Sequence, residues 1–134
     1  MSEAPPFTKL LIANRGEIAV RILRTCRELG IRTVAVYSEP DRQALHVRYS
    51  DEAYALGGKT PAESYLRGEA ILEIAKKCGA DAIHPGFGFL AENGEFAQSV
   101  IDAGICFVGP SPHAMKVMGD KLASRQAMVA TGVP

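Results

Sequence analysis

Two short segments contain the residue types best suited to binding or chemistry. Asn14 and Arg15 follow an apolar run, and the stretch from His84 to Phe89 (HPGFGF) combines two glycines with two aromatic residues. Glycine permits close approach of the backbone to a ligand, and loops carry function more often than core positions do. Two interpretations remain open. Either these segments face a ligand, or Asn14 is a turn residue, Arg15 is solvated, and Phe89 and Leu90 simply cover the core.

A third candidate is Lys121, which falls in the first turn of an expected helix. The helix dipole disfavours a cation there unless an anion, such as a phosphate, occupies the same end. From its position alone, a solvated lysine is the simpler interpretation. His84 and His113 have no cysteine or acidic partner at metal-ligand spacing, so we expect structural histidines and no metal site.

Other chemistry has no recognisable motif in the sequence. The dinucleotide fingerprint needs three glycines spaced as G-x-G-x-x-G, whereas only Gly16 follows the first expected strand, which argues against NAD or FAD. A Walker motif, a nucleophile elbow and a catalytic-triad order are not recognisable either.

An alternation of apolar patterns indicates the elements that must position these residues. Short apolar runs predict buried strands, and apolar residues spaced by three and four predict amphipathic helices. The expected strands are 9–13, 33–37, 52–56, 81–84 and 105–108, and the expected helices are 17–29, 45–49, 69–78 and one that Asn93 caps and Gly104 ends. Thr60 to Glu63 has the spacing of a capping box for one more short helix, which Gly68 separates from the next. This order predicts a Rossmann-like α/β fold with a parallel sheet.

Two further helices are expected beyond this domain, over 111–118 and 120–130, before the chain stops at Pro134. A chain that stops on the first residues of a new turn is typical of an interrupted connection. We therefore expect a flexible tail over 1–8, one α/β domain over 9–110, and the opening of a second, truncated domain over 111–134.

Composition excludes several classes of protein. The 134 residues, 47% of them hydrophobic, suffice for one globular core without disulfides or metal. Fifteen Lys and Arg balance 15 Asp and Glu, which leaves no basic footprint for nucleic acid or a membrane surface. No apolar run approaches the roughly 20 residues of a membrane span, and the N-terminus lacks signal-peptide features, so we expect a cytoplasmic protein. Cys26, Cys78 and Cys106 lie in apolar patterns and are expected to be small buried residues.

Three segments together resemble the N-terminal region of the biotin carboxylase family. They are IANRGEIAVRILRTCRELGIRTVAVYSEPD, IHPGFGFLAEN and MGDK, and the resemblance covers nearly all of residues 9–134. The family includes the biotin carboxylases of acyl-CoA carboxylases and the front of pyruvate carboxylase. The resemblance implies a pre-ATP-grasp domain, followed by the first helices of an incomplete ATP-grasp domain. It also implies that the complete protein uses MgATP and bicarbonate to carboxylate biotin on a carrier domain.

The resemblance assigns roles to four residues. Lys121 in MGDK matches the lysine that contacts ATP phosphate, which gives a purpose to the cation noted above. Phe87 matches a position near the biotin pocket that is commonly Tyr, so the aromatic wall is kept and a hydroxyl is lost. Arg24 and Glu28 match the family's homodimer contact and lie one helical turn apart.

The remaining functional parts of the family lie beyond Pro134. They include the glycine-rich lid, the metal-binding glutamates and the catalytic residues, so we expect no catalytic or metal-binding residue here and no activity in the isolated chain. The implied partners are a biotin carboxyl carrier domain, a carboxyltransferase and a second copy of the biotin carboxylase.

Two other functions remain as alternatives. The first is the front domain of another ATP-grasp ligase, such as a carbamoyl-phosphate or purine-pathway enzyme, which the HPGFGFLAEN loop disfavours. The second is a non-catalytic module that dimerises with a full-length carboxylase through Arg24 and Glu28.

Overall fold

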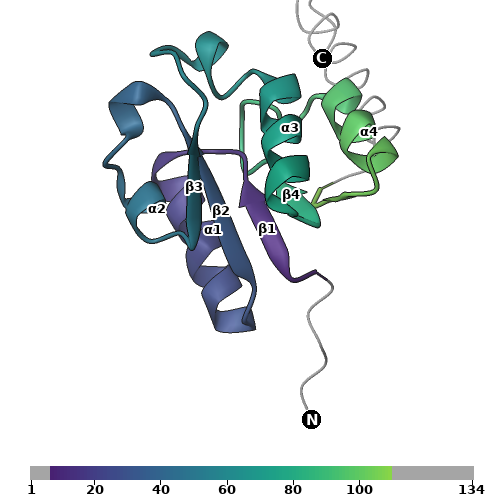
Figure 1. The fold of residues 1–134 in the computed structure, drawn as a ribbon, viewed down its shortest axis with the longest axis horizontal. Coiled ribbons are helices and arrows are strands. Elements are labelled where there is room, and N and C mark those ends of the chain that lie inside the picture. The colour runs from purple at the N-terminus through teal and green to yellow at the C-terminus, as the bar shows by residue number, and fades with distance from the viewer. Residues whose placement is uncertain (1–6, 110–134) are drawn as a thin grey trace, which may run out of the picture.

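The computed structural model describes residues 7–109, in which five parallel strands form one open sheet with helices on both faces (Figure 1). The strands lie in the order β3-β2-β1-β4-β5. Their bounds are β1 Lys9–Ile12, β2 Arg32–Tyr37, β3 Glu52–Ala55, β4 Ala82–His84 and β5 Cys106–Phe107. The order and the parallel pairing confirm the predicted Rossmann-like sheet.

Four α-helices and two 3-10 turns connect the strands within residues 7–109. They are α1 Gly16–Leu29, η1 Glu39–Asp41, α2 Leu45–Arg48, η2 Pro61–Glu63, α3 Gly68–Cys78 and α4 Gly94–Asp102. The observed ends differ by no more than one residue from the ranges that the sequence predicts. The capping box at Thr60 is present, with reciprocal bonds between Thr60 and Glu63.

Helix α1 shows why the periodicity is a reliable guide. Ala19, Leu23 and Cys26 recur on one face and are buried, while Arg24 and Glu28 lie on the exposed face. Gly30 then ends the helix in the left-handed conformation that glycine adopts without strain (φ 74°).

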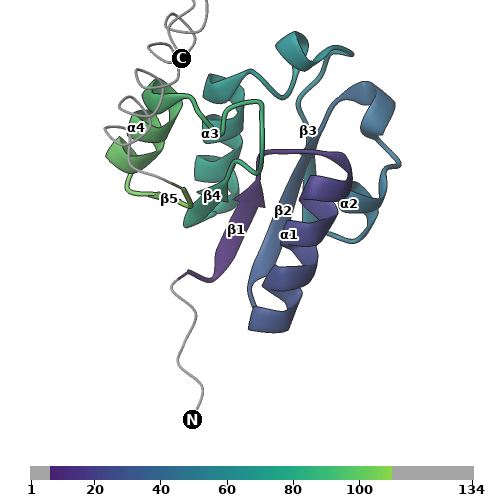
Figure 2. The same ribbon diagram turned by 180° about the vertical axis from the view of Figure 1, so that it is seen from behind.

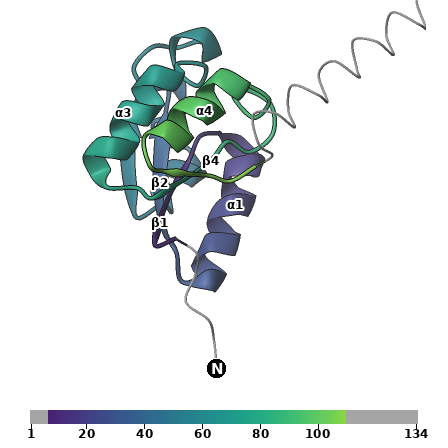
Figure 3. The same ribbon diagram turned by 90° about the vertical axis from the view of Figure 1, so that its right-hand side faces the viewer.

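The sheet separates two apolar clusters. Leu10 and Ile12 of β1 pack with the buried face of α1, whereas Leu11 packs with the residues of α3 and α4 on the other side. Figure 3 shows α1 on one side of the sheet and α3 and α4 on the other, and Figure 2 shows α1 lying across the face formed by β1 and β2. Strand β1 is therefore covered on both faces, as a central parallel strand requires.

Gly68 lies between the short helix and the next one, as the sequence predicts, because η2 ends at Glu63 and α3 begins at Gly68 itself. A Cβ at Gly68 would lie 2.7 Å from the Phe96 ring. The absence of a side chain allows α3 and α4 to approach each other. The expectation of three buried cysteines is wrong for two of them. Cys106 lies on the edge strand β5 and is exposed, and Cys78 packs against an apolar cluster but is only half-buried, so of the three Cys26 alone is a buried residue.

The cap of α4 provides a test of local stability. The Asn93 side chain accepts a hydrogen bond from the Phe96 N–H at 3.0 Å. We expect Asn93→Ala to lower the free energy of unfolding by about 1 kcal/mol, because a helix N–H loses its acceptor. Urea denaturation measures the change, with exposed Glu92→Ala as the control. Equal losses in both variants would contradict a capping role.

None of the helices within residues 7–109 combines the length and the apolar character that crossing a membrane requires.

Candidate functional site at the carboxyl edge of the sheet

The carboxyl ends of β1 and β4 lie level with each other. Ile12 pairs with His84 in the register, and the Ala13 N–H donates to the His84 carbonyl at 2.9 Å. Strand order reverses at β1, because β2 and β3 lie on one side of it while β4 and β5 lie on the other. Open α/β sheets bind ligands in the crevice at such a switch point. We call the segments that meet here, residues 14–15, 38–41 and 84–90 together with Tyr65, the carboxyl-edge site.

Asn14 joins the end of β1 to the loop after β4. It is 1% exposed, and its Nδ2 donates to the carbonyls of Pro85 at 2.9 Å and Phe87 at 2.8 Å. Its Oδ1 accepts the Arg15 N–H at 2.8 Å. The interpretation of Asn14 as a simple turn residue is therefore wrong, because its amide is buried and both of its N–H groups bind another loop.

The loop after β4 has an unusual backbone. Gly86, Gly88 and Phe89 all have positive φ, at 70°, 75° and 44°. Glycine adopts such angles freely, whereas Phe89 is strained by them. Leu90 is buried and Phe89 packs against the core, which confirms that these two residues cover it. Phe87 is different, because it is 78% exposed and stands free at the edge.

His84 supports the same loop. Its Nδ1 accepts the Gly86 N–H at 3.0 Å. Burial lowers the pKa of His84, so the ring is neutral near pH 7 and its Nδ1 remains an acceptor. This bond fits the expectation of a structural histidine. His113 and Lys121, the other two candidates from the sequence, lie outside the described residues.

Asp41 is the centre of a second, buried network at this edge. Its carboxylate accepts a bidentate pair of hydrogen bonds from Arg15, from Nε at 2.6 Å and from Nη2 at 2.9 Å. The buried Tyr65 hydroxyl donates to the same carboxylate at 2.6 Å and accepts the Ser38 N–H at 3.1 Å. The Arg15 side chain is half-exposed but bound, so the expectation of a merely solvated arginine is wrong. Sequence reasoning recognised Asp41 only as a turn residue and missed Tyr65, for which no local signal exists.

Tyr65 connects this network to the loop. Its ring stacks on Phe89 with centroids 5.3 Å apart. A continuous set of contacts thus runs from Asn14 through Arg15, Asp41 and Tyr65 to Phe89, and the Asn14 amide closes it at Phe87. The loop is held from both of its ends.

The Asp41 network predicts an acid-sensitive fold. The Arg15 guanidinium, opposed by partial burial, lowers the pKa of Asp41 from 3.8 to about 2. A carboxyl group whose pKa is lower in the folded state stabilises the fold above pH 3.8 and loses that contribution as the pH falls towards 2. We therefore expect the stability of the wild type to fall more steeply between pH 5 and about 2.5 than that of Asp41→Asn, measured by urea denaturation. Parallel curves would contradict the assignment.

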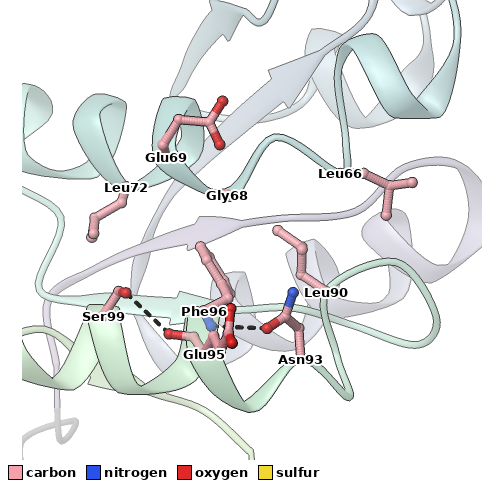
Figure 4. Close-up of a pocket in the computed structure, with 9 residues that line it drawn as sticks. All are labelled: Leu66, Gly68, Glu69, Leu72, Leu90, Asn93, Glu95, Phe96 and Ser99. Atoms are coloured by element: carbon pink, nitrogen blue, oxygen red, sulfur yellow. Dashed lines mark hydrogen bonds between the residues drawn. The ribbon is translucent and has the colours of Figure 1, made fainter.

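Besides an apolar groove along α1 that His84 also lines, two hollows lie near the site. One, of about 210 Å³, borders the Asp41 network and is lined partly by Arg15, Lys59 and Phe89. The other, of about 320 Å³, lies between the N-terminal parts of α3 and α4 (Figure 4). Its floor is apolar, and Glu69 and Glu95 line it as well. Phe87 lines neither of these two hollows.

Arg24 and Glu28 lie apart from this edge. Helix α1 begins there at Gly16, and Arg24 follows eight residues later, about 12 Å along the axis. Both side chains are exposed. The ion pairs found among the described residues do not join them, and the pair on this helix is Glu17 with Arg21 at 3.4 Å. The structure therefore presents Arg24 and Glu28 to solvent on a surface separate from Phe87.

The strand order and the polar carboxyl edge define an open α/β domain of the Rossmann-like class. Residues 6–115 match the family model described as "Biotin carboxylase, N-terminal domain". The chain belongs to this family. The match favours the biotin carboxylase resemblance over the other ATP-grasp ligases.

Several relatives are similar over nearly the whole chain. The biotin carboxylase of Halalkalibacterium halodurans is 59% identical over 128 residues, which are 96% of this chain and 28% of the relative. Mitochondrial pyruvate carboxylase of Rattus norvegicus is 52% identical over 133 residues, 98% of this chain and 11% of the relative. The chain thus spans less than a third of the length of these relatives.

Solved structures agree with this assignment. The biotin carboxylase domain of a single-chain bacterial carboxylase superposes with a TM-score of 0.83 at 48% identity, over 95% of this chain and 30% of that one. Pyruvate carboxylase of Rhizobium etli gives a TM-score of 0.84 at 45% identity, over 97% of this chain and 13% of that one.

Proposed function

We propose that this chain is the N-terminal domain of a biotin carboxylase, an ATP-dependent ligase. In the complete protein it would work with MgATP and bicarbonate to carboxylate biotin on a carrier domain. The observation that carries the proposal is the family match over residues 6–115, which includes the loop that Asn14 holds at the carboxyl edge. The domain boundaries that the sequence predicts, 9–110 and 111–134, are part of the same proposal.

Phe87 is the residue we assign to the biotin pocket. Its ring is exposed at the switch-point edge and is flanked by Gly86 and Gly88, so nothing on the neighbouring Cα atoms obstructs a flat ligand. This arrangement fits an apolar wall against a ring system. The phenylalanine cannot donate the hydrogen bond of the more common tyrosine, so we assign it packing alone.

Lys121 is assigned to the ATP phosphates because it matches the lysine of the family's MGDK motif, and an anion would favour a cation in the first turn of the helix that the sequence predicts there. ATP, with its magnesium ion, supplies the phosphoryl group that activates bicarbonate. The described residues supply none of the family's metal ligands, and we assign catalysis and metal binding to the rest of the complete protein.

We assign Arg24 and Glu28 to a homodimer contact across a two-fold axis, where each could pair with the other residue of the second copy. Their exposure on α1 supports this assignment. The alternative function, a non-catalytic module that dimerises with a full-length carboxylase, would use the same face of α1. Co-purification with a full-length carboxylase tests this contact. If Arg24→Glu reduces the amount of this chain that is retained with the carboxylase, the contact is supported, and unchanged retention contradicts it. We also place the protein in the cytoplasm, for which the free thiols of Cys26, Cys78 and Cys106 are suited, and cell fractionation tests this.

The proposed function is tested by ATP turnover. We expect bicarbonate-dependent ATP hydrolysis that biotin stimulates in the complete carboxylase carrying this chain. We expect none from the purified 134-residue chain, because the proposed catalytic and metal-binding groups belong to other domains. Turnover by the isolated chain, or biotin-insensitive turnover by the complete protein, would contradict the proposal. The carrier domain and the carboxyltransferase are the partners we expect to receive the product.

A further inference from the structure

The intrinsic backbone preferences of its residues do not explain the conformation of the loop that carries Phe87. Three of its four residues from Gly86 to Phe89 have positive φ, and a non-glycine residue such as Phe89 at φ 44° costs on the order of 1 kcal/mol. Such a conformation persists only where surrounding contacts determine it. Beside the bond from the Gly86 N–H to His84, the side-chain hydrogen bonds around Phe87 come from Asn14, which alone binds the Phe87 peptide unit among the described residues.

Asn14 contacts the loop on both sides of Gly86. Its two N–H groups bind the carbonyls of Pro85 and Phe87, so one planar amide fixes two peptide units. The amide has one orientation, because its Oδ1 accepts the Arg15 N–H. A flip by 180° would set Oδ1 against the two carbonyls and the NH2 group against the Arg15 N–H. The close fit extends to Gly86, where a Cβ would lie 2.6 Å from the Asn14 Nδ2. Burial of Asn14 makes the loss of either bond costly.

We propose that Asn14 is a positioning residue for biotin, which acts by holding the Gly86–Phe87 backbone in the shape that presents the Phe87 ring. The proposal rests on the assignment of Phe87 to the biotin pocket made above. It explains why an amide stands at this position. A carboxylate of the same size would repel the two carbonyls that the amide binds, and a hydroxyl could donate to only one of them.

The test separates biotin binding from the other substrates in the complete carboxylase. We expect Asn14→Asp to raise KM for free biotin by about tenfold, because a displaced binding surface loses complementarity. KM for MgATP and the bicarbonate-dependent ATP hydrolysis measured without biotin should stay within about twofold. Leu23→Ala serves as the control. Leu23 is buried in α1, on the face of the sheet opposite to the one that Phe89 and Leu90 of the loop cover. It should lower Tm and leave KM for biotin unchanged.

A double-mutant cycle tests whether Asn14 acts through Phe87. Phe87→Leu alone should raise KM for biotin, and Asn14→Asp combined with Phe87→Leu should raise it by less than the product of the two single effects. If Asn14→Asp does not fold, Asn14→Ser, which keeps one donor, takes its place in both measurements. An unchanged KM for biotin, or equal changes for biotin and MgATP, would overturn the proposal. If biotin does not stimulate ATP hydrolysis by the complete wild-type protein, the proposed function itself is overturned.

Discussion

Asp41→Asn is expected to lower the free energy of unfolding by about 3 kcal/mol, and Tm by on the order of 10 °C. The Asp41 carboxylate is 91% buried as a side chain, and it accepts bonds from Arg15 and Tyr65 at 2.6 Å each. An amide of the same size offers at most one oxygen to these donors and sets its own N–H groups against one of them. Both 2.6 Å bonds go to Oδ2, so an amide oxygen in that place keeps them, but the amide NH2 group then faces Arg15 Nη2, and the guanidinium loses the charge that it pairs with.

The control for this variant is Glu39→Gln, two residues away. It makes the same change of charge on an exposed side chain, and we expect a change within about 0.5 kcal/mol. Thermal unfolding followed by circular dichroism compares the two. Similar losses would mean that the charge, and not the buried hydrogen bonds of Asp41, stabilises the edge.

Gly86→Ala is expected to cost about 3 kcal/mol, because two effects act together at this residue. The φ of 70° strains any residue with a Cβ, and that Cβ would lie 2.6 Å from the Asn14 Nδ2 and 3.0 Å from its Cβ. The clash is with a buried and fully bonded amide, which has no room to move. The loop must therefore shift, and the bonds from Asn14 to Pro85 and Phe87 must lengthen.

Gly88→Ala is the matched control in the same loop. Its φ of 75° is nearly the same, but nothing lies within 4 Å of the added Cβ. We expect a loss of about 1 kcal/mol from backbone strain alone. The difference between the two variants in urea denaturation measures the contact with Asn14. Equal losses would show that the close fit around Gly86 is not important.

The fold was predictable because its signals are local. Each strand lies in one short apolar run, and the periodicity of α1 and the glycine at its end are read from neighbouring residues. The boundary at Gly68 was predictable, but its contact with Phe96, a residue of another helix, was not. Nothing in the surrounding sequence distinguishes a glycine that breaks a helix from one that lets two helices pack.

The site was predictable in position but not in its bonds. The sequence places Asn14 and His84 at strand ends, and parallel pairing brings those ends to one edge. Whether Asn14 faces solvent or a neighbouring loop depends on residues more than 70 positions away. Tyr65 shows the same limit, because its partners Asp41 and Phe89 come from different loops. The resemblance to a known family added the proposed role of Phe87, which its exposure alone does not suggest.

The pairing of β1 with β4 has a consequence for the order in which the chain acquires its shape during synthesis. Strand β1 pairs with β2 across 23 residues, as Lys9 with Arg32 shows, so the half that contains β1, α1 and β2 can assemble early. The two carbonyls that Asn14 binds follow it by 71 and 73 residues. A contact can form only after both of its partners have left the ribosome, so the Asn14 amide has no partners until residues 85–87 have been synthesised. Until then the growing chain can pair β1 with β2 but cannot form the bonds that hold the Phe87 loop.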